Sequence, residues 1–440
     1  MSLKRLASLP LRTGSLTTCS IHARARTVSS FHNASQQKHT SSSSYLLLKR
    51  PIPLSLPVTR PRHNWPWRCT HGRRSLSTIG LPGFLVPPLV FVGLFITLWA
   101  YKCCMMIIFQ NKIIYMPSVP PFSRGEKIED YAASCRPVAW EEKQIRSLDG
   151  TKIALCVGRI AGEAADTARG GKKRKHVVVL YFQGNASSLP PRLPFLSASL
   201  KTLQQKGGAH HDAGADYTIV ALSYRGYWTS RGRASQRGIE LDARAALRWV
   251  EETYPPNDPS VDNRVVLWGQ SIGAGVATSL LMQHLSSSSS SSASAVTATA
   301  ADIQIPRRIH GLILETPFLS IRSMLAAIYP QKWLPYKYLW PFLRNWWDSE
   351  IALKSIGEAK LRAGEREREE EQLPILIITA KNDELVPAEQ ADVLEKLCAE
   401  VGLRDVSRVD VGGALHTNAT IRAGGRVAVA RFLRRMGEEE

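Results

Sequence analysis

Five short, almost wholly apolar runs constrain the fold of this chain more than any other feature of its sequence. Each run is six or seven residues long, and helix-like segments such as 238–254 lie between them. Strands that are apolar on both sides lie in sheets covered on both faces, and strands that alternate with helices form parallel βαβ units. The sequence therefore predicts an α/β fold with a mostly parallel sheet flanked by helices. The runs are 176–182, 217–223, 264–269, 309–315 and 373–379. A further pair of strand-like runs flanks Asp149-Gly150, which predicts a hairpin.

The charge of the chain is concentrated in its first part. Residues 1–125 contain no Asp or Glu and hold 16 of the 57 Lys and Arg residues of the chain. The remainder carries 41 basic and 37 acidic residues, so it is nearly neutral. A nucleic-acid-binding domain concentrates its basic residues on the folded part, so we expect no nucleic-acid partner. Residues 1–80, rich in Arg and Ser, match a mitochondrial transit peptide better than a secretory signal; a disordered basic tail is the alternative.

An uncharged stretch, residues 81–101, follows this leader. About 20 apolar residues suffice to cross a bilayer, and Trp99 and Tyr101 stand at one end, where interfacial aromatics are found. We therefore expect one transmembrane helix, kinked or shifted at its start by Pro87-Pro88; a buried core helix is the alternative. The basic leader favours an N-terminal side in the matrix or cytosol. A mitochondrial inner-membrane protein facing the intermembrane space is favoured over one of the endoplasmic reticulum membrane.

The rest of the chain divides into a juxtamembrane linker, 102–139, and one domain, 140–440. Low-complexity inserts interrupt the domain between elements, where added length costs little closure entropy. They lie near 161–175, 205–215, 285–304 and 358–372. The seven cysteines form no C-x-x-C pair, and nothing in the sequence indicates a metal or organic cofactor.

The run 264–269 leads into Gly-Gln-Ser-Ile-Gly, with Ser271 at its centre. A buried strand that ends in G-x-S-x-G and continues as a helix is the context of a nucleophile elbow. In that arrangement the acid and the histidine follow the serine along the chain, on loops after late strands. Asp383 follows the run 373–379, and His416 is the one histidine after Asp383. The sequence therefore predicts a Ser271, His416, Asp383 triad, although Asp383 is also suited to cap the helix that follows.

A serine triad also needs backbone N–H groups that stabilise the oxyanion. One donor is expected directly after the nucleophile, at Ile272. The other is expected in the loop after the run 176–182, and we assign it to Asn185. Arg225 and Tyr224 are interpreted as residues that brace a neighbouring loop, and Asp242 as a structural partner in its helix.

At these motifs the chain, from about residue 107 onward, resembles the Bem-type (bud-emergence) α/β-hydrolases. These are membrane-anchored serine hydrolases related to serine-aminopeptidase-like and monoacylglycerol-lipase-like enzymes. The resemblance implies the α/β-hydrolase fold and the same triad. The chain departs from the family pattern at Gln183, where His is usual, and at Leu415, where Gly is usual. The matching pieces are FQNKIIYMP, LYFQGNASS, SYRGYWTSRGRASQRGIELDARAAL, WGQSIGAG, LILETPFLS, KNDELVP and ALHTN.

Residues 319–349 are dense in aromatic side chains and are broken by three prolines. We interpret this segment as a small cap, with Trp333, Trp340 and Trp346 lining an acyl pocket; core packing is the alternative. The leading hypothesis is a membrane-anchored serine hydrolase that cleaves carboxylic esters or thioesters of lipid-like acyl groups, such as monoacylglycerol or acyl-protein. A peptidase on the same fold and a catalytically silent membrane-tethered scaffold are the alternatives.

Overall fold

The computed structural model of the chain describes residues 82–160, 173–204, 215–291, 309–362 and 372–438. The expected leader, 1–80, and most of the four low-complexity inserts lie outside these residues.

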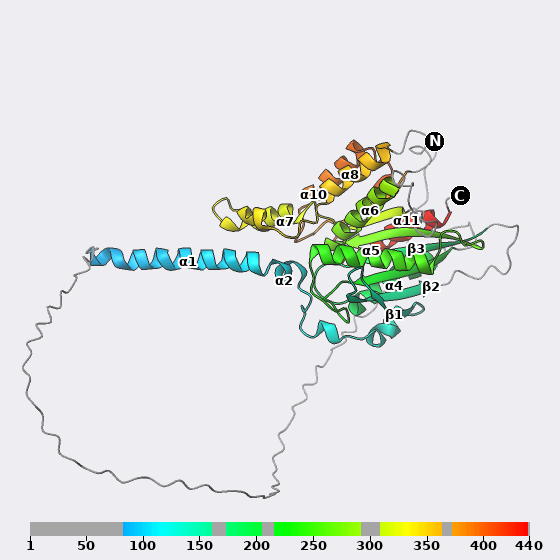
Figure 1. Cartoon of the computed structure of the whole chain (residues 1–440), viewed down its shortest axis with the longest axis horizontal. Helices are drawn as coiled ribbons and strands as arrows, with labels where there is room; N and C mark the ends of the chain where they lie inside the picture. Colours follow the sequence, from blue (N-terminus) through cyan, green and yellow to red (C-terminus); the bar gives the residue numbers. More distant parts are fainter. Residues whose placement is uncertain (1–81, 161–172, 205–214, 292–308, 363–371, 439–440) are drawn as a thin grey trace, which may run out of the picture. The chain divides into compact units, whose positions relative to one another are not determined.

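Eight strands form one sheet in the described part of the chain (Figure 1). They are β1 (Ala139–Arg146), β2 (Lys152–Ile160), β3 (Arg174–Phe182), β4 (Asp216–Ser223), β5 (Val261–Gln270), β6 (Ile309–Glu315), β7 (Ile375–Ala380) and β8 (Val406–Val411). Their order is β1-β2-β4-β3-β5-β6-β7-β8. β2 is antiparallel to β1 and β4, and the other neighbouring pairs are parallel. All the apolar runs are strands, and the predicted Asp149-Gly150 hairpin joins β1 to β2, with Gly150 at a φ of +81°.

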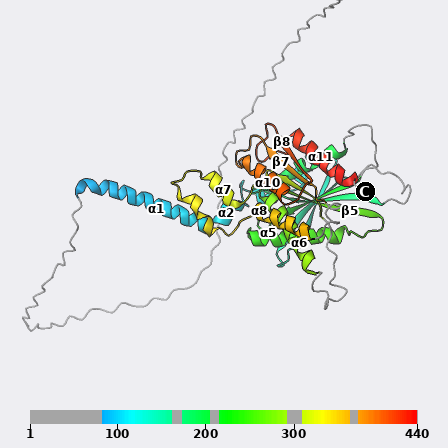
Figure 2. The same ribbon diagram turned by 90° about the horizontal axis from the view of Figure 1, so that it is seen from above.

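Some helices in the described part of the chain cover the two faces of the sheet, and others lie in the segments before or beside it. They are α1 (Val86–Ile108), α2 (Gln110–Tyr115), α3 (Ala132–Cys135), α4 (Leu193–Gln204), α5 (Gln236–Thr253), α6 (Ile272–Ser291), α7 (Ile321–Ile328), α8 (Ser349–Arg362), α10 (Glu389–Glu400) and α11 (Ala423–Glu438). Short 3-10 helices are η1 (Gly83–Leu85), η2 (Ser123–Gly125), η3 (Glu129–Tyr131), η4 (Pro190–Arg192) and η5 (Pro335–Phe342). Figure 2 shows α11 on one side of the sheet and α5 and α6 on the other.

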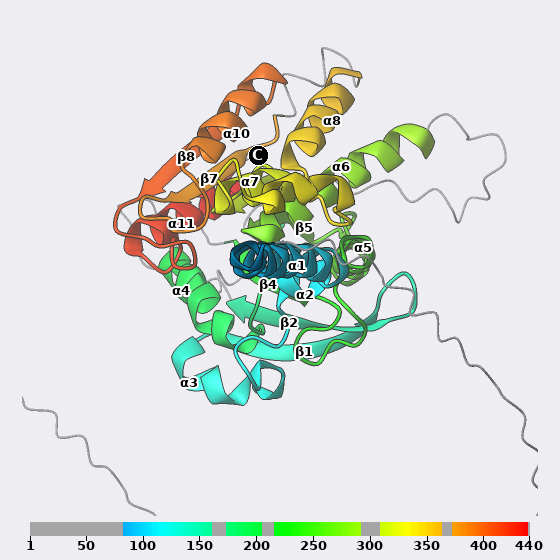
Figure 3. The ribbon, with the colours of Figure 1, turned by 90° about the vertical axis from the view of Figure 1, so that its left-hand side faces the viewer.

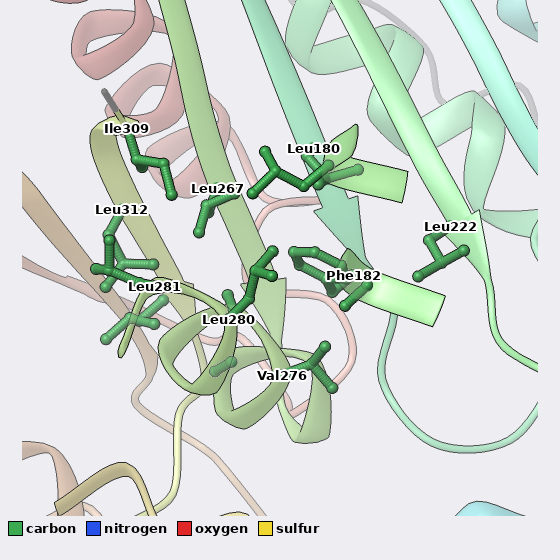
Figure 4. Close-up of a cluster of buried hydrophobic side chains, with 14 of the residues drawn as sticks. Leu180, Phe182, Leu222, Leu267, Val276, Leu280, Leu281, Ile309 and Leu312 are labelled. Atoms are coloured by element: carbon green, nitrogen blue, oxygen red, sulfur yellow. The ribbon is translucent and has the colours of Figure 1, made fainter. Parts of the chain in front are cut away.

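The two faces of the sheet pack into two separate cores. Successive side chains of a strand point to opposite faces. Leu180 and Phe182 of β3 therefore pack with α5 and α6, as Figure 4 shows for α6, while Val179 and Tyr181 pack with α4 and α11. This two-sided burial explains why the central strands are apolar along their whole length. Together with the strand order it confirms the predicted fold class.

The apolar stretch before the domain forms one continuous helix. Residues Gly83–Ile108 have a mean hydropathy of 2.0, and none of the apolar window is buried. By length and composition this helix is able to cross a membrane. Its α-helical part begins at Val86, after the 3-10 turn η1, so Pro87 and Pro88 stand in the first α-helical turn, where an N–H group has no α-helical acceptor. The helix is thus shifted toward the later CCMMII, one of the two expected alternatives.

Other boundaries also differ from the expected ones. The segment 102–139, expected as a linker, contains the end of α1 together with α2, η2, η3 and α3, and Tyr115 within it is fully buried. The serine run and the insert near 358 begin inside helices, since α6 extends to Ser291 and α8 to Arg362. The expected cap, 319–349, contains α7 and η5, and its prolines lie outside α7.

Candidate active site

Ser271 is the turn between a strand and a helix. β5 ends directly before it and α6 begins directly after it. Its φ of +52° is a left-handed conformation that is strained for any residue other than glycine. Flanking glycines make the turn possible: a Cβ on Gly269 would lie 2.1 Å from the Gly273 carbonyl oxygen, and one on Gly273 would lie 2.1 Å from a carbonyl oxygen of β3. The local geometry is that of a nucleophile elbow.

The structure brings the three expected triad residues together from the ends of three strands. The His416 Nε2 atom lies 2.8 Å from the Ser271 Oγ atom. The His416 Nδ1 atom lies 2.9 and 3.1 Å from the two carboxylate oxygens of Asp383. A carboxylate at Nδ1 selects the tautomer in which Nδ1 carries the proton, so Nε2 is the acceptor that faces the serine hydroxyl. All three residues are largely buried.

Backbone and side-chain donors hold the Asp383 carboxylate in place. The N–H groups of Leu385 and Val386 donate to its Oδ1 atom, at 2.9 and 2.8 Å. Burial alone would raise the pKa of Asp383, but the hydrogen bonds from His416 and Val386 outweigh it and keep the pKa below its usual value. The carboxylate is therefore ionised at neutral pH. Asp383 is not the cap of the following helix, because α10 has Ala388 at its N-cap.

Of the two expected oxyanion donors, Ile272 lies directly after Ser271, and Asn185 lies in a loop that passes the serine. Ile272 is the first residue of α6, so its N–H belongs to the N-terminal groups without an intrahelical acceptor. A Cβ on Gly184 would lie 3.6 Å from the Cβ of Ser271, so the loop after β3 passes directly beside the serine. Asn185 follows Gly184 in this loop. The geometry is therefore compatible with the expected pair of donors.

The segment after α1 anchors the rest of the loop. The Ala186 N–H donates to the Tyr115 carbonyl oxygen at 2.9 Å, and the Ser187 N–H donates to the Val119 carbonyl oxygen. Ala186 and Ser187 both have positive φ values, which these bonds stabilise. Since those two N–H groups already have acceptors, the oxyanion donor of this loop lies before them, which is consistent with the expected Asn185.

Tyr115 also connects this loop to the end of the aromatic segment. Its hydroxyl donates to the Asn345 Oδ1 atom at 2.9 Å and accepts from the Trp347 Nε1 atom at 2.9 Å. Trp347 in turn packs on α6, where a Cβ on Gly275 would lie 3.0 Å from its Cβ. No local pattern in the sequence indicates these contacts of Tyr115, although Tyr115 lies within the FQNKIIYMP piece that resembles the family.

Gln183 occupies the position where the family usually has His. Its side-chain nitrogen is buried and has no hydrogen-bond partner among the described residues, and such an unsatisfied group typically costs about 1–3 kcal/mol. Its carbonyl oxygen accepts from the Tyr224 hydroxyl at 2.8 Å. Tyr224 therefore braces the loop after β3, as its sequence context indicated.

Arg225 and Asp242 form a buried ion pair. The Asp242 carboxylate is fully buried and accepts from the Arg225 backbone N–H at 3.0 Å and from its Nη2 atom at 2.7 Å. Arg225 also donates to Asp149 at 2.7 Å. This hydrogen bond holds the pKa of Asp149 well below its usual range. A Cβ on Gly238 would lie 2.5 Å from the Arg225 Cδ atom, so a glycine there leaves room for the guanidinium. Both residues are structural, as expected.

Glu315 is a residue near the site to which the sequence had assigned no role. It ends β6, and its carbonyl oxygen accepts the Ser271 N–H at 2.8 Å. Its buried carboxylate accepts from Trp268 at 3.1 Å, Gln270 at 3.3 Å and Thr420 at 2.8 Å. It therefore ties the elbow to the loop that carries His416. The one available signal was its position in the LILETPFLS piece.

The three expected pocket tryptophans lie in different surroundings. Trp333 is 66% exposed and its ring stacks on Trp99 of α1. Trp340 is also exposed, with the Arg322 guanidinium over its ring. Trp346 is half-buried, and its backbone N–H donates to the Gln236 Oε1 atom. Trp333 and Trp340 are therefore surface residues, and Trp346 is the one of the three that is partly enclosed.

No family model matches the chain. Curated relatives include the Bem46 protein of Schizosaccharomyces pombe, 28% identical over 50% of this chain and 56% of that protein. The α/β-hydrolase domain-containing protein WAV2 of Arabidopsis thaliana is 25% identical over 64% of this chain and 73% of that protein. The lysophosphatidylserine lipase ABHD12 of Danio rerio is 28% identical over 51% of this chain and 48% of that protein. The chain thus spans about half the length of Bem46 and ABHD12.

Among solved structures, the chain is similar to the Pyrococcus furiosus esterase Pf2001, with 17% identity and a TM-score of 0.42 over 70% of this chain and 93% of that one. An α/β-hydrolase from Vibrio vulnificus has 16% identity and a TM-score of 0.45 over 74% of this chain and 91% of that one. The likeness of the chain to the Bem46-type proteins rests on its sequence relatives, and the sheet order agrees with it. On these grounds the chain has the α/β-hydrolase fold and is similar to the Bem46-type members of that group.

Proposed function

We propose that this α/β-hydrolase is a membrane-anchored serine hydrolase that cleaves carboxylic esters or thioesters of lipid-like acyl groups. The observation that carries the proposal is the continuous hydrogen-bonded chain from Ser271 through His416 to Asp383. A serine hydroxyl is a weak nucleophile until an adjacent base accepts its proton. A scaffold without activity would have no physical need for this ordered set at a strained turn.

The reaction proceeds in two steps. His416 takes the proton of the Ser271 hydroxyl while the oxygen attacks the acyl carbon, and the N–H groups of Ile272 and Asn185 stabilise the negative oxygen that forms. His416 then donates the proton to the leaving alcohol or thiol, which leaves an acyl-enzyme on Ser271. Water, deprotonated by His416, releases the acid and restores the serine. Asp383 stabilises the imidazolium in both steps.

The substrate class is inferred from the surroundings of the triad. The lysophosphatidylserine lipase ABHD12 is a relative whose name states a lipid substrate. Trp347, near the end of the aromatic segment 319–349, packs on the helix that carries the elbow. Apolar walls of this kind line most sites for acyl groups. Trp346, half-buried next to Trp347, is the best candidate for such a wall among the three tryptophans expected there.

The proposed anchor is the helix Gly83–Ile108, and the proposed compartment is the mitochondrial inner membrane, with the domain in the intermembrane space. The long apolar helix supports the anchor. The acid-free, Arg- and Ser-rich leader supports the compartment.

Purified full-length protein in detergent is expected to turn over p-nitrophenyl esters, acyl-thioesters and monoacylglycerols, and to react covalently with a fluorophosphonate probe. The reason is that a triad-activated serine attacks both acyl and phosphonyl centres. Turnover of the panel and in-gel fluorescence measure the two results. Wild-type protein that neither labels nor hydrolyses any member of the panel would identify the chain as a scaffold.

A fusion of residues 1–101 to a fluorescent protein is expected to reach mitochondria and to stay in the membrane pellet after alkaline carbonate extraction. The basic leader directs the first result and the apolar helix the second. Microscopy and fractionation measure them separately. A reticular signal would contradict the compartment, and release into the supernatant would contradict the anchor.

A further inference from the structure

The last turns of α1 contact the aromatic segment of the domain. The Trp99 and Trp333 rings stack with centroids 5.7 Å apart. The Lys102 ammonium lies 4.2 Å from the centroid of the Tyr336 ring. Figures 1 and 3 show α7 close to α1, and η5 is in contact with α1. The apolar helix and the aromatic segment therefore meet at a defined level of the helix.

A second set of contacts fixes the register between the two segments. The Arg344 Nη2 atom donates to the carbonyl oxygens of Ile107 and Ile108 at 2.9 and 3.0 Å, where α1 ends. The Gln110 side chain accepts from the Arg344 N–H and donates to the Phe342 carbonyl oxygen. The end of the aromatic segment is thus bonded to the end of α1.

The aromatic segment also exposes large apolar side chains. We name as the aromatic tip Ile328, Trp333, Tyr338, Trp340 and Phe342, each classed as exposed. Single exposed apolar residues are ordinary, whereas these five all fall within residues 328–342, in the segment that contacts α1. Lys332 and Lys337 stand in the same segment, and Lys and Arg stems beside aromatics are typical of membrane interfaces.

The position of α1 in a bilayer fixes the depth of the tip. Lys102 is the one charged residue of α1, and Gly83 to Tyr101 precede it without a charge. About 20 residues at 1.5 Å each span a hydrocarbon core of roughly 30 Å. If this stretch crosses the core, Trp99 and Lys102 lie at the interface on the side of the domain. Trp333, stacked on Trp99, must then lie at the same level.

We propose that the aromatic tip is immersed in the interface of the bilayer that α1 crosses, as a second, non-spanning membrane contact. The occupant is lipid rather than a protein, because the exposed surface continues directly from the lipid-facing helix. Trp and Tyr are the residues that favour this level of a bilayer. The inference rests on the membrane anchor in the proposed function. It also deepens that proposal, since the segment that carries the tip leads within a few residues to Trp347, against the helix of the elbow. Acyl substrates would thus approach the serine from the membrane surface.

The test uses the full chain reconstituted into phosphatidylcholine vesicles, with or without lipids brominated near the headgroup end of their acyl chains. Bromine quenches the indoles that it touches, so lost emission reports tryptophans at that depth. Wild type is compared with Trp333→Phe, Trp99→Phe and Phe342→Trp. Trp249→Phe is the matched control, since Trp249 lies on α5 and packs against the core.

We expect Trp333→Phe and Trp99→Phe each to remove quenchable emission, Phe342→Trp to add it, and Trp249→Phe to leave it unchanged. If only Trp99→Phe reduces the quenched emission, the helix is in the bilayer and the tip is not, so the inference fails while the anchor stands. A protein partner covering the tip would give that same result. If Trp99→Phe has no effect, both the anchor and the inference fail. Ester hydrolysis is measured separately on the panel in detergent, so its success or failure is independent of these outcomes.

Discussion

Ser271→Ala is expected to lower kcat for ester hydrolysis by about 10⁴- to 10⁶-fold, the range seen when triad members are removed. The change deletes the oxygen that lies 2.8 Å from His416 and leaves the imidazole without a nucleophile to activate. The elbow itself should persist, because alanine adopts the left-handed φ of this turn no less readily than serine does. Initial rates on a p-nitrophenyl ester, with circular dichroism as the folding check, measure the effect.

Ser279→Ala is the matched control for this variant. Ser279 lies on the same helix, α6, two turns beyond the elbow, and its hydrogen bonds to described residues are long, at 3.4 Å to Glu240 and 3.3 Å from Gln283. Its replacement should leave kcat within about twofold of wild type, since the hydroxyl is not bonded to any triad residue. Retention by Ser271→Ala of more than about a thousandth of wild-type kcat would show that another group is the nucleophile.

The position of the candidate triad was predictable because each of its residues follows a strand that the sequence identifies. The carboxyl ends of parallel strands meet at one edge of a sheet, so residues after β5, β7 and β8 converge there whatever their separation in the chain. Sequence order then restricts the histidine to His416, the one histidine beyond Asp383. The structure brings these side chains within hydrogen-bonding distance. Their roles in catalysis remain the prediction that the Ser271 variant tests.

The contacts that fix the surroundings of the triad were not predictable, because they join segments with no shared local pattern. In the sequence Tyr115 is one more aromatic residue after an apolar helix. In the structure its carbonyl oxygen accepts from the Ala186 N–H, and its hydroxyl donates to Asn345. Contacts between segments so far apart in the sequence form only when the rest of the domain brings those segments together. The exposure of Trp333 is a similar case. A segment so rich in aromatic residues indicates that Trp333 is buried. The residue on which the exposed Trp333 ring stacks, Trp99, lies more than two hundred residues earlier in the sequence.

The Pro87-Pro88 pair marks the start of the apolar helix, because of the two expected alternatives, a kinked start and a shift toward the later CCMMIIF, the structure has the shift. Prolines inside a helix break it, and a helix assumed to begin at residue 81 places them inside. In the structure α1 begins at Val86, so both prolines lie in its first turn. Hydropathy alone does not locate a helix start to within a turn, whereas the prolines themselves mark it.

Asp242→Ala is expected to lower the free energy of unfolding by about 3–5 kcal/mol, the cost of removing one partner of a buried ion pair. The carboxylate is fully buried and accepts several bonds from Arg225, so its loss leaves the guanidinium with Asp149 as its remaining carboxylate partner. For a domain of this size the loss corresponds to a fall in Tm of roughly 6–10 °C. Thermal unfolding of the full chain in detergent, at one fixed scan rate, measures it.

Glu252→Ala on the same helix supplies the control. Its carboxylate pairs with Arg248 one turn away, and both side chains are exposed, at 53% and 64%. Exposed pairs of this spacing contribute about 0.3–0.5 kcal/mol, so Tm should fall by no more than about 1 °C. The two variants thus remove the same chemical group from one helix and differ in its burial. An equal, small loss in both would mean that water reaches Asp242 and that the loop after β4 is not braced by this pair.

A double variant separates the pair from its surroundings. Arg225→Ala and Asp242→Ala each destroy the same interaction, so the combined loss should be smaller than the sum of the single losses by roughly 1–3 kcal/mol. The difference arises because the second change no longer leaves a buried charge without its partner. Losses that add fully would show that Arg225 and Asp242 stabilise the domain through separate contacts. In that case Arg225 would act mainly through Asp149 and Ser147, its other partners in the structure.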